Sequence, residues 1–570
     1  MNILNFYSKK INQAIKKGFQ NIEDDALKKL SVELPPEQFD FDLSSNAPMV
    51  LAKKYNLKPM ELAKKFKEIF IKEIDDFNEI DIIKPGFLNI KLKLSAIEDY
   101  IKIIFNESKK FGSLKEKKKF NLEFVSANPT GPMHVGHCRG AIFGDVISNL
   151  LKFNGNDVVK EYYINDYGNQ VNFFAKSVFY RIREIKENIK FPQDKNLYPG
   201  HYIKDIAKKI IKDFPKKSFS DFNKNLKIIT DFSLKTSMKY IKDDLKSLGI
   251  HHDVFISEKE ILAKTDMNKL FDKMENDGFV EQGFLKPPIN ENKKSKEKKK
   301  KLIFKSSSFG DDNDRALVKD DGSWTYFAND IAYHNNKVER KFDFLINILG
   351  ADHTGYIKRI TAAVEALSKN KTKLICKVCQ LVKLFKKGEP YKMSKRAGEF
   401  VSAKDLLSEV SKDVVRFMML YRSNDVELDF DFDKVLEKNK DNPVFYVQYC
   451  NARINSIFRI IKKDITKINF SKFKNKLNYY EIKILRKIFE WPKIIQNSSI
   501  RLEPHRIPFY LYELSTLFHT YWSKGNEDKH LRFLDGEKIQ NPNSLIIMKI
   551  IYIVLHNGMK ILNVSLPQKM

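Results

Sequence analysis

From residue 120 the sequence alternates short apolar runs with longer amphipathic runs, and this alternation limits the fold more than any other feature. FNLEFVSA (120–127) is followed by a helical pattern, AIFGDVISNLLKFNG (141–155), and then by VVKEYYIND (158–166). A strand, a helix and a second strand in this order are typical of a βαβ unit with parallel strands. The order of strand, turn and helix recurs in FLINILGADHTGYIKRI (344–360). We therefore expect a parallel sheet with a nucleotide site at the carboxyl ends of its strands.

The flanking sequences predict different architectures. Residues 1–95 combine helical patterns with DIIKPGFLNIKL (81–92), where alternation around a Pro-Gly pair predicts a hairpin in a small α+β domain. From about Asp441 the chain is amphipathic at helical spacing and rich in aromatic residues, which predicts an all-α bundle. The predicted fold is multidomain α/β, with a Rossmann-like parallel-sheet domain over residues 118–405 and the helical domain over 406–570.

The charge of the chain points to its partner. The sequence has 102 Lys and Arg against 73 Asp and Glu, a net charge of +29. Such an excess is typical of proteins that bind an anionic polymer, although a lysine-rich composition alone gives the same number.

The cysteine count and the apolar runs indicate the compartment. Four cysteines are too few for a disulfide framework, which favours a reducing environment. Cys376 and Cys379 form a CxxC in a strand-like run, where they would face opposite sides, so we predict no metal site there. Residues 1–19 contain no apolar core of a signal peptide. The longest apolar run, residues 545–555, is interrupted by Lys549 and is shorter than the roughly 18 to 20 residues of a membrane span. We expect a cytoplasmic protein without a membrane partner.

Two histidines stand three residues apart in SANPTGPMHVGHCRGAIFGD (126–145), after a Pro-Gly turn and before a helical run. Three explanations are open: His134 and His137 bind a metal ion, they complete a turn, or they bind phosphate. The third explanation uses the whole setting, because a helix N-terminus attracts anions and imidazoles there can donate hydrogen bonds to phosphate oxygens. Gly136, between them, would let a nucleotide approach the backbone closely.

The phosphate explanation predicts a second cationic element. GEPYKMSKRAGEF (388–400) contains Lys392, Lys395 and Arg396 in a segment bounded by Gly and Pro, and a loop of this kind can close on a leaving pyrophosphate. In isolation the same segment could be a solvated lysine loop.

HVGH followed by KMSK resembles the HIGH and KMSKS motifs of class I aminoacyl-tRNA synthetases. The segments around these motifs, among them EFVSANPTGPMHVGH, DDGSWTYFANDIAYH and DNPVFYVQYCNARI, resemble those of bacterial arginyl-tRNA synthetases over nearly the whole chain. The resemblance implies that residues 1–95 bind the tRNA elbow and that the helical domain binds the anticodon.

The resemblance also implies a reaction, its substrates and its residues. L-arginine and ATP, with Mg²⁺, would form arginyl-adenylate and pyrophosphate, and tRNA(Arg) would then accept the arginyl group and release AMP. Efficient activation of arginine would need bound tRNA, and we expect a monomer. The catalytic positions are His134, His137, Lys392 and Lys395. The positions matching the ATP-binding motifs are His134, Gly136, His137, Lys392, Met393, Ser394 and Lys395.

Five residues match the arginine-binding positions of the family: Glu123, Asn128, Tyr326, Asp330 and His353. A guanidinium is a planar fork of five donors and is best held by carboxylates and carbonyl oxygens. We expect Asp330 to bind the guanidinium beside Tyr326, and Glu123 and Asn128 to hold the α-amino end. A strand-end ion pair for Glu123 and a helix-surface charge for Asp330 are the alternatives.

Two features depart from the family pattern, and three other functions are alternatives. Arg396 stands where KMSKS has its last serine, and the tract Lys293–Lys301 looks like an insertion. A class I synthetase for cysteine would want a zinc site, which four cysteines do not provide here. A non-catalytic tRNA-binding descendant would be expected to have lost HVGH or KMSK. A metal-dependent nucleotidyltransferase matches only the first half of the chain.

Overall fold

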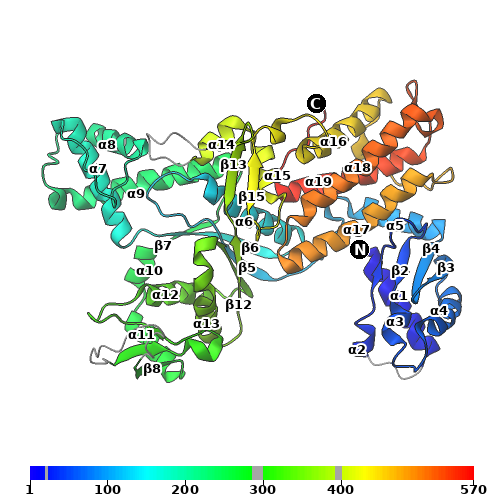
Figure 1. The fold of residues 1–570 in the computed structure, drawn as a ribbon, viewed down its shortest axis with the longest axis horizontal. Helices are drawn as coiled ribbons and strands as arrows, with labels where there is room; N and C mark the ends of the chain where they lie inside the picture. The colour runs from blue at the N-terminus through cyan, green and yellow to red at the C-terminus, as the bar shows by residue number, and fades with distance from the viewer. Residues whose placement is uncertain (20–23, 285–299, 392–400) are drawn as a thin grey trace. The chain divides into compact units, whose positions relative to one another are not determined.

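The computed structural model describes residues 1–19, 24–284, 300–391 and 401–570 (Figure 1). These residues form two compact units. One is Glu116–Leu436, and the other combines Met1–Lys115 with Glu437–Met570. The break near residue 436 lies beyond position 405, where we placed the end of the parallel-sheet domain. The three predicted domain ranges stay predictions.

The unit Glu116–Leu436 is built on a parallel sheet, which confirms the predicted α/β class. Its strands lie side by side in the order β12 (Lys373–Cys379), β11 (Phe344–Gly350), β5 (Lys119–Glu123), β6 (Asp157–Ile164) and β7 (Val254–Ser257), and each adjacent pair is parallel. Because the chain continues from β5 to β6 on one side while β11 pairs on the other, the strand order reverses at β5. A crevice for ligands is expected at the carboxyl ends of β5 and β11.

Three helices lie close to these strands in sequence. Helix α6 (Val135–Phe153) begins within HVGH, α12 (Tyr326–Glu339) precedes β11, and α13 (Ile357–Ser368) links β11 to β12. Thr325 caps α12 by accepting a hydrogen bond from the backbone N–H of Ala328 at 3.3 Å. Gly144 lets α6 lie directly on the end of β5, since a Cβ there would sit 2.4 Å from the side chain of Phe124.

Two groups of elements are inserted into this unit. Helices α7 (Asn169–Glu187), α8 (His201–Asp213) and α9 (Phe222–Ser247) lie between β6 and β7 in sequence, pack on one another and share a buried apolar core (Figure 1). After β7 come helices α10 (Glu258–Lys264) and α11 (Met267–Asn276) and an antiparallel sheet of β8 (Val280–Gly283), β9 (Lys301–Phe304) and β10 (Arg315–Ala316). Most of the tract Lys293–Lys301 lies outside the described residues.

The last part of this unit is a small sheet and two helices. These elements are β13 (Val382–Lys386), β14 (Glu389–Pro390), β15 (Leu428–Asp431), α14 (Ala403–Glu409) and α15 (Lys412–Leu420). Arg416 on α15 pairs with Asp145 on α6 at 2.5 Å, and Lys160 on β6 pairs with the same carboxylate at 2.6 Å. Burial opposes the ionisation of Asp145, yet these two cations hold the pKa of its carboxyl below the ordinary value.

In the second unit, the N-terminal segment forms a sheet and its covering helices. The strands β1 (Val32–Glu33), β2 (Leu43–Ser45), β4 (Phe87–Leu92) and β3 (Phe77–Ile83) are antiparallel, and the helices are α1 (Ile3–Gly18), α2 (Asp24–Leu27), α3 (Ala47–Leu51), α4 (Pro59–Glu73) and α5 (Leu94–Glu107). Strands β3 and β4 pair on either side of the Pro-Gly turn, so the predicted hairpin is confirmed.

The C-terminal segment of this unit is helical, as predicted. Its long helices are α16 (Pro443–Ile460), α17 (Tyr479–Arg501), α18 (Arg506–Glu527) and α19 (Asn543–Leu562), with a short hairpin of β16 (Leu534–Asp535) and β17 (Lys538–Ile539) before α19. Trp491 on α17 is fully buried and its indole N–H donates to the carbonyl oxygen of Phe111 at 3.0 Å.

Helix α19 corrects one expectation. Within the described residues it is long and apolar enough to cross a membrane by length and composition, with a mean hydropathy of 1.7, whereas we expected the run to be too short. However, 78% of this stretch is buried inside the protein, as in the core helix of a bundle. Lys549 lies within this buried stretch, where its ammonium group is satisfied by donating to the carbonyl oxygens of Ile465 at 2.8 Å and Thr466 at 3.1 Å.

Candidate active site

The HVGH turn places both imidazoles at the start of α6. His134 is the N-cap residue, and its backbone N–H donates to Nδ1 of His137 at 3.3 Å. The two rings stack with their centroids 3.7 Å apart. Burial and the neighbouring His134 lower the pKa of His137 to about 3, and burial lowers the pKa of His134. Both rings are therefore neutral near pH 7, and an Nδ1 acceptor leaves the proton of His137 on Nε2 as a hydrogen-bond donor.

Gly136 has a further reason to lack a side chain. A Cβ at this position would lie 2.9 Å from ring atoms of His134, so a larger residue would displace that imidazole. The predicted close approach of a nucleotide to Gly136 remains a prediction.

The KMSK residues Lys392, Met393, Ser394 and Lys395, and with them Arg396, lie outside the described residues. The chain that follows them returns to the HVGH turn. The backbone N–H of Val135 donates to the carbonyl oxygen of Val401, and that of Ala403 donates to the carbonyl oxygen of Met133, each at 2.9 Å. Ser402 and His134 form an antiparallel bridge between these bonds. The segment after KMSK is thus paired directly with the segment that carries the histidines.

Two carboxyl groups gather at the carboxyl end of the sheet. Asp330 on α12 is half-buried and accepts a hydrogen bond from the hydroxyl of Tyr356. Burial, together with the charge of Glu123, raises the pKa of Asp330 to about 7. Glu258 is the first residue of α10, and burial, with the charges of Asp330 and Asp166, raises its pKa to about 7. A cation bound beside these two carboxyls would favour their ionised forms and lower their pKa values toward the ordinary range. Raised pKa values of this kind are typical of functional sites.

Three further predicted residues lie on exposed positions. Tyr326 is the first residue of α12 and is 63% exposed. The amide oxygen of Asn128 accepts a hydrogen bond from Asn165 at 3.1 Å, which orients its side chain. His353 lies in the turn that follows β11 and pairs with Asp352 at 3.5 Å, and its side chain is 61% exposed.

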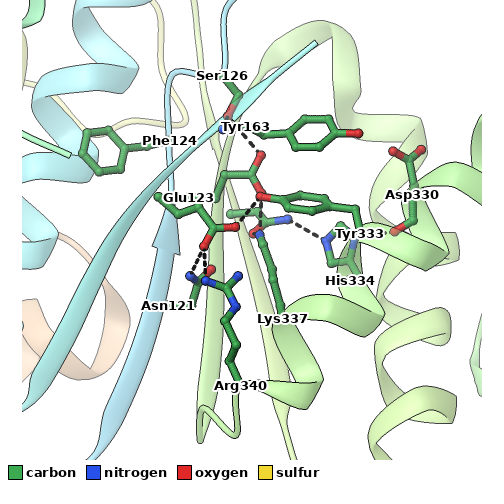
Figure 2. A network of polar contacts seen from close by, with 12 residues as sticks. Asn121, Glu123, Phe124, Ser126, Tyr163, Asp330, Tyr333, His334, Lys337 and Arg340 are labelled. Atoms are coloured by element: carbon green, nitrogen blue, oxygen red, sulfur yellow. Dashed lines mark hydrogen bonds and ion pairs between the residues drawn. The ribbon is translucent and has the colours of Figure 1, made fainter. Parts of the chain in front are cut away.

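Glu123, at the end of β5, stands in a dense polar network (Figure 2). One carboxylate oxygen accepts a hydrogen bond from the hydroxyl of Ser126 at 3.0 Å. The other accepts one from the hydroxyl of Tyr333 at 3.0 Å and forms an ion pair with Lys337. Its side chain is 12% exposed, so part of the carboxylate remains accessible. Glu123 is thus ion-paired at a strand end, which agrees with the alternative given in the sequence analysis, and a ligand could still reach it.

Comparison with known protein families covers most of the chain. The model for tRNA synthetases class I (R), catalytic domain, matches residues 100–435. The arginyl tRNA synthetase N terminal domain model matches residues 5–92, and the DALR anticodon binding domain model matches residues 447–570.

Individual relatives match the chain from end to end. It is 52% identical over 578 residues to an arginine–tRNA ligase of Pelagibacter ubique, with all of both chains covered. The chain belongs to the arginyl-tRNA synthetase family. An arginine–tRNA ligase of Bartonella tribocorum is 42% identical over 587 residues, again over all of both chains. The Thermus thermophilus arginyl-tRNA synthetase structure has the same fold, with a TM-score of 0.72 over 99% of this chain and 100% of that chain, at 17% identity.

Membership in the arginyl-tRNA synthetase family establishes the reaction. The chain is a class I enzyme that ligates L-arginine to tRNA(Arg) with ATP, through the aminoacyl-adenylate that is general to this class. The rival functions, a cysteine-specific synthetase, a non-catalytic tRNA-binding protein and a metal-dependent nucleotidyltransferase, are thereby set aside.

Sequence reasoning missed Glu258. Its side chain is 8% exposed and follows β7 directly, at the same edge of the sheet as Glu123. The signal in the sequence was weak, because an acidic residue in the first turn of a helix is common for electrostatic reasons alone. Only the position of α10 after a parallel strand could have drawn attention to it.

Proposed function

We propose that Asp330 and Glu258 bind the guanidinium group of arginine and that Tyr326 lines this end of the pocket. One observation carries the proposal. Two carboxyl groups lie at the carboxyl end of the sheet, and burial is the main reason that the pKa of each is raised to about 7. A guanidinium with five fixed donors satisfies two carboxylates at once, so binding would release their protons. Glu123 and Asn128 would hold the α-amino end, with His353 at the mouth of the pocket.

For the activation step we propose that the neutral imidazoles of His134 and His137 donate to phosphate oxygens. The arginine carboxylate attacks the α-phosphorus of ATP, and the bond to the pyrophosphate breaks as the bond to the carboxylate forms. Charge grows on the phosphate oxygens during this step, and donors already in position stabilise it. The Nε2–H of His137 at the start of α6 supports this role.

Lys392 and Lys395 would clamp the β- and γ-phosphates, and Met393 and Ser394 would line the nucleotide. The pairing of Ser402 with His134 supports this proposal, because it ties the end of the segment containing KMSK to the HVGH turn. ATP would enter with Mg²⁺ bound mainly through phosphate oxygens and water, as is usual for this ion.

For tRNA we propose that residues 1–95 bind the elbow and residues 406–570 bind the anticodon, while residues 118–405 carry the catalysis. The net charge of +29 supports an RNA partner, since each bound phosphate is neutralised by a lysine or arginine. We further propose that the enzyme is a cytoplasmic monomer and that tRNA must be bound before arginine is activated efficiently. A sedimentation experiment on the purified chain tests the monomer.

The first experiment is ATP–pyrophosphate exchange with each amino acid in turn, with and without tRNA(Arg). Exchange should occur with arginine alone, should depend on tRNA and should be lost in Asp330→Ala. The matched control is Glu339→Ala, which removes an exposed carboxylate from the last turn of the same helix, where it accepts a hydrogen bond from Asn335 at 2.9 Å, and should retain exchange. Equal losses in both variants would contradict the assignment of Asp330. Exchange with a different amino acid would contradict an arginine pocket.

A further inference from the structure

Lys337 occupies an unusual place for a lysine. Its side chain is 0% exposed, and its ammonium group forms the ion pair with Glu123 and donates to the amide oxygen of Asn347 at 3.2 Å. The same ammonium lies 4.6 Å from the centroid of the Tyr333 ring. Burying a lysine ammonium costs folding free energy unless the charge is paired with a carboxylate. Glu123 is therefore held in position by a buried cation of the fold.

A second ion pair lies beside the first (Figure 2). Arg340 pairs with Glu161 on β6 at 2.7 Å, and Glu161 also accepts a hydrogen bond from Asn121 at 2.8 Å. The single hydroxyl proton of Tyr333 is shared between Glu161, 2.7 Å away, and Glu123, 3.0 Å away. Burial opposes the ionisation of Glu161, but the charges of Lys337 and Arg340 hold its pKa below the ordinary value. Glu123 and Glu161 are register partners on neighbouring strands, and they are matched by two cations, Lys337 on α12 and Arg340 at the C-cap of that helix.

Asp330, which lies on the same helix α12, has a different electrostatic environment. Asp330, Tyr333, Lys337 and Arg340 follow one another at spacings of three, four and three residues, which places them on one face of the helix. Glu123 is ion-paired with Lys337 on this face, whereas Asp330 forms no ion pair among the described residues, and its pKa is raised by burial and by the nearby carboxylate of Glu123. The two ends of the proposed arginine pocket therefore differ in charge.

We propose that Lys337 is a positioning residue for arginine, which acts by holding Glu123 in place and cancelling its charge. Glu123 then receives the α-amino end of the substrate through hydrogen bonds. The guanidinium group is directed to Asp330 and Glu258, which form no ion pair among the described residues, although the charge of Arg359 acts on Asp330 from a distance. The inference rests on the proposed function, since it requires that Glu123 binds the substrate.

The test compares Lys337→Met with Arg340→Met in ATP–pyrophosphate exchange at saturating tRNA(Arg). Lys337→Met removes the cation that pairs with Glu123, and Arg340→Met removes the cation that pairs with Glu161. Of these two cations, Lys337 is the one that contacts Glu123. We expect Lys337→Met to raise the KM for arginine by about 10- to 100-fold, because the truncated partner of a buried ion pair leaves its mate uncompensated. The KM for ATP should change by less than about threefold. Arg340→Met should lower the melting temperature without raising the KM for arginine.

The double variant Glu123→Gln/Lys337→Met separates positioning from general destabilisation. If Lys337 acts through Glu123, Lys337→Met adds little to the KM effect that Glu123→Gln already causes. Multiplied effects, or an equal rise in Arg340→Met, would show a merely structural role and overturn the inference. If Lys337→Met does not fold, Lys337→Gln replaces it, since the amide still donates to Glu123 without a charge.

The two ways in which the reasoning can fail are distinguishable. If Glu123→Gln leaves the KM for arginine unchanged, the proposed role of Glu123 is wrong and the inference falls with it. If Glu123→Gln raises this KM while Lys337→Met and Lys337→Gln leave it unchanged, Glu123 binds arginine without help from Lys337, and only the inference is overturned.

Discussion

Arginine should bind more tightly as the pH rises from about 6 to about 8. The guanidinium group remains charged over this range, and the α-amino group of free arginine titrates above it. On the enzyme, burial raises the pKa of Asp330 to about 7, and burial with neighbouring acidic charges raises that of Glu258 to about 7. Low pH therefore keeps both carboxyls protonated, and protonated carboxyls attract a cation weakly.

The size of the effect follows from these pKa values. A carboxyl with a pKa of about 7 is roughly 9% ionised one unit below that pH and roughly 91% ionised one unit above it. The association constant for arginine should thus rise about tenfold if one carboxylate is needed, and up to about 100-fold if both are needed. Since Asp330 and Glu258 interact, the two protons will be lost as a coupled pair rather than residue by residue.

Isothermal titration calorimetry of arginine binding tests this without the chemistry of ATP, whose own protonation would interfere. Measurements near the midpoint in two buffers of different ionisation enthalpy should show release of about one proton per arginine bound, roughly half from each carboxyl, and the release should approach two protons at lower pH. The protons do not come from His137, because its pKa of about 3 leaves the ring neutral throughout. Asp330→Asn should reduce both the proton release and the pH dependence. An affinity that is constant over this range, with no proton released by the wild-type enzyme, would refute the reasoning.

Three further outcomes are expected. His137→Ala should lower kcat of ATP–pyrophosphate exchange by roughly 100- to 1,000-fold with little change in the KM for arginine, since it removes a donor to the transition state; an equal rise in that KM would contradict this role. Arg416→Met should lower the free energy of unfolding by about 3 to 5 kcal/mol in urea titrations, because Asp145 stays buried with Lys160 alone; a loss below about 1 kcal/mol would contradict it. The affinity for tRNA(Arg) should fall by roughly 10³- to 10⁵-fold between about 50 and 200 mM salt if six to ten phosphates are contacted, as filter binding would measure.

The order of elements could be predicted from the sequence because it depends on local patterns. The spacing of apolar residues identified β5, α6 and β6, and parallel strands followed from their alternation. The Pro-Gly pair before β4 likewise marked a hairpin. Helix α19 was misjudged because a lysine in an apolar run was treated as an interruption. The partners of Lys549 are backbone carbonyls more than 80 residues away, and no local pattern contains them.

The candidate site was predictable only in part, for the same reason. His134 and His137 lie in one turn of the chain, so their spacing in the sequence predicts that their side chains are close. Lys337 and Glu123 are 214 residues apart, and they meet because β11, the strand that follows α12, pairs with β5. Glu258 reaches the same edge of the sheet because β7 pairs with β6. Topology, rather than sequence distance, decides which charges meet.

The difference in charge between the two ends of the proposed pocket also bears on the choice between arginine and lysine. Both substrates carry an α-amino group, so the end at Glu123, neutralised by Lys337, cannot distinguish them. The discrimination must come from Asp330 and Glu258. A planar guanidinium can donate to both carboxylates, whereas a single ammonium at the end of a shorter side chain leaves donors missing and one carboxyl unpaired. An unpaired buried carboxyl can avoid that cost by remaining protonated, since its pKa is already near 7. The rejection of lysine should therefore be strongest above about pH 8, where both carboxyls are ionised before the substrate arrives, and weaker at low pH.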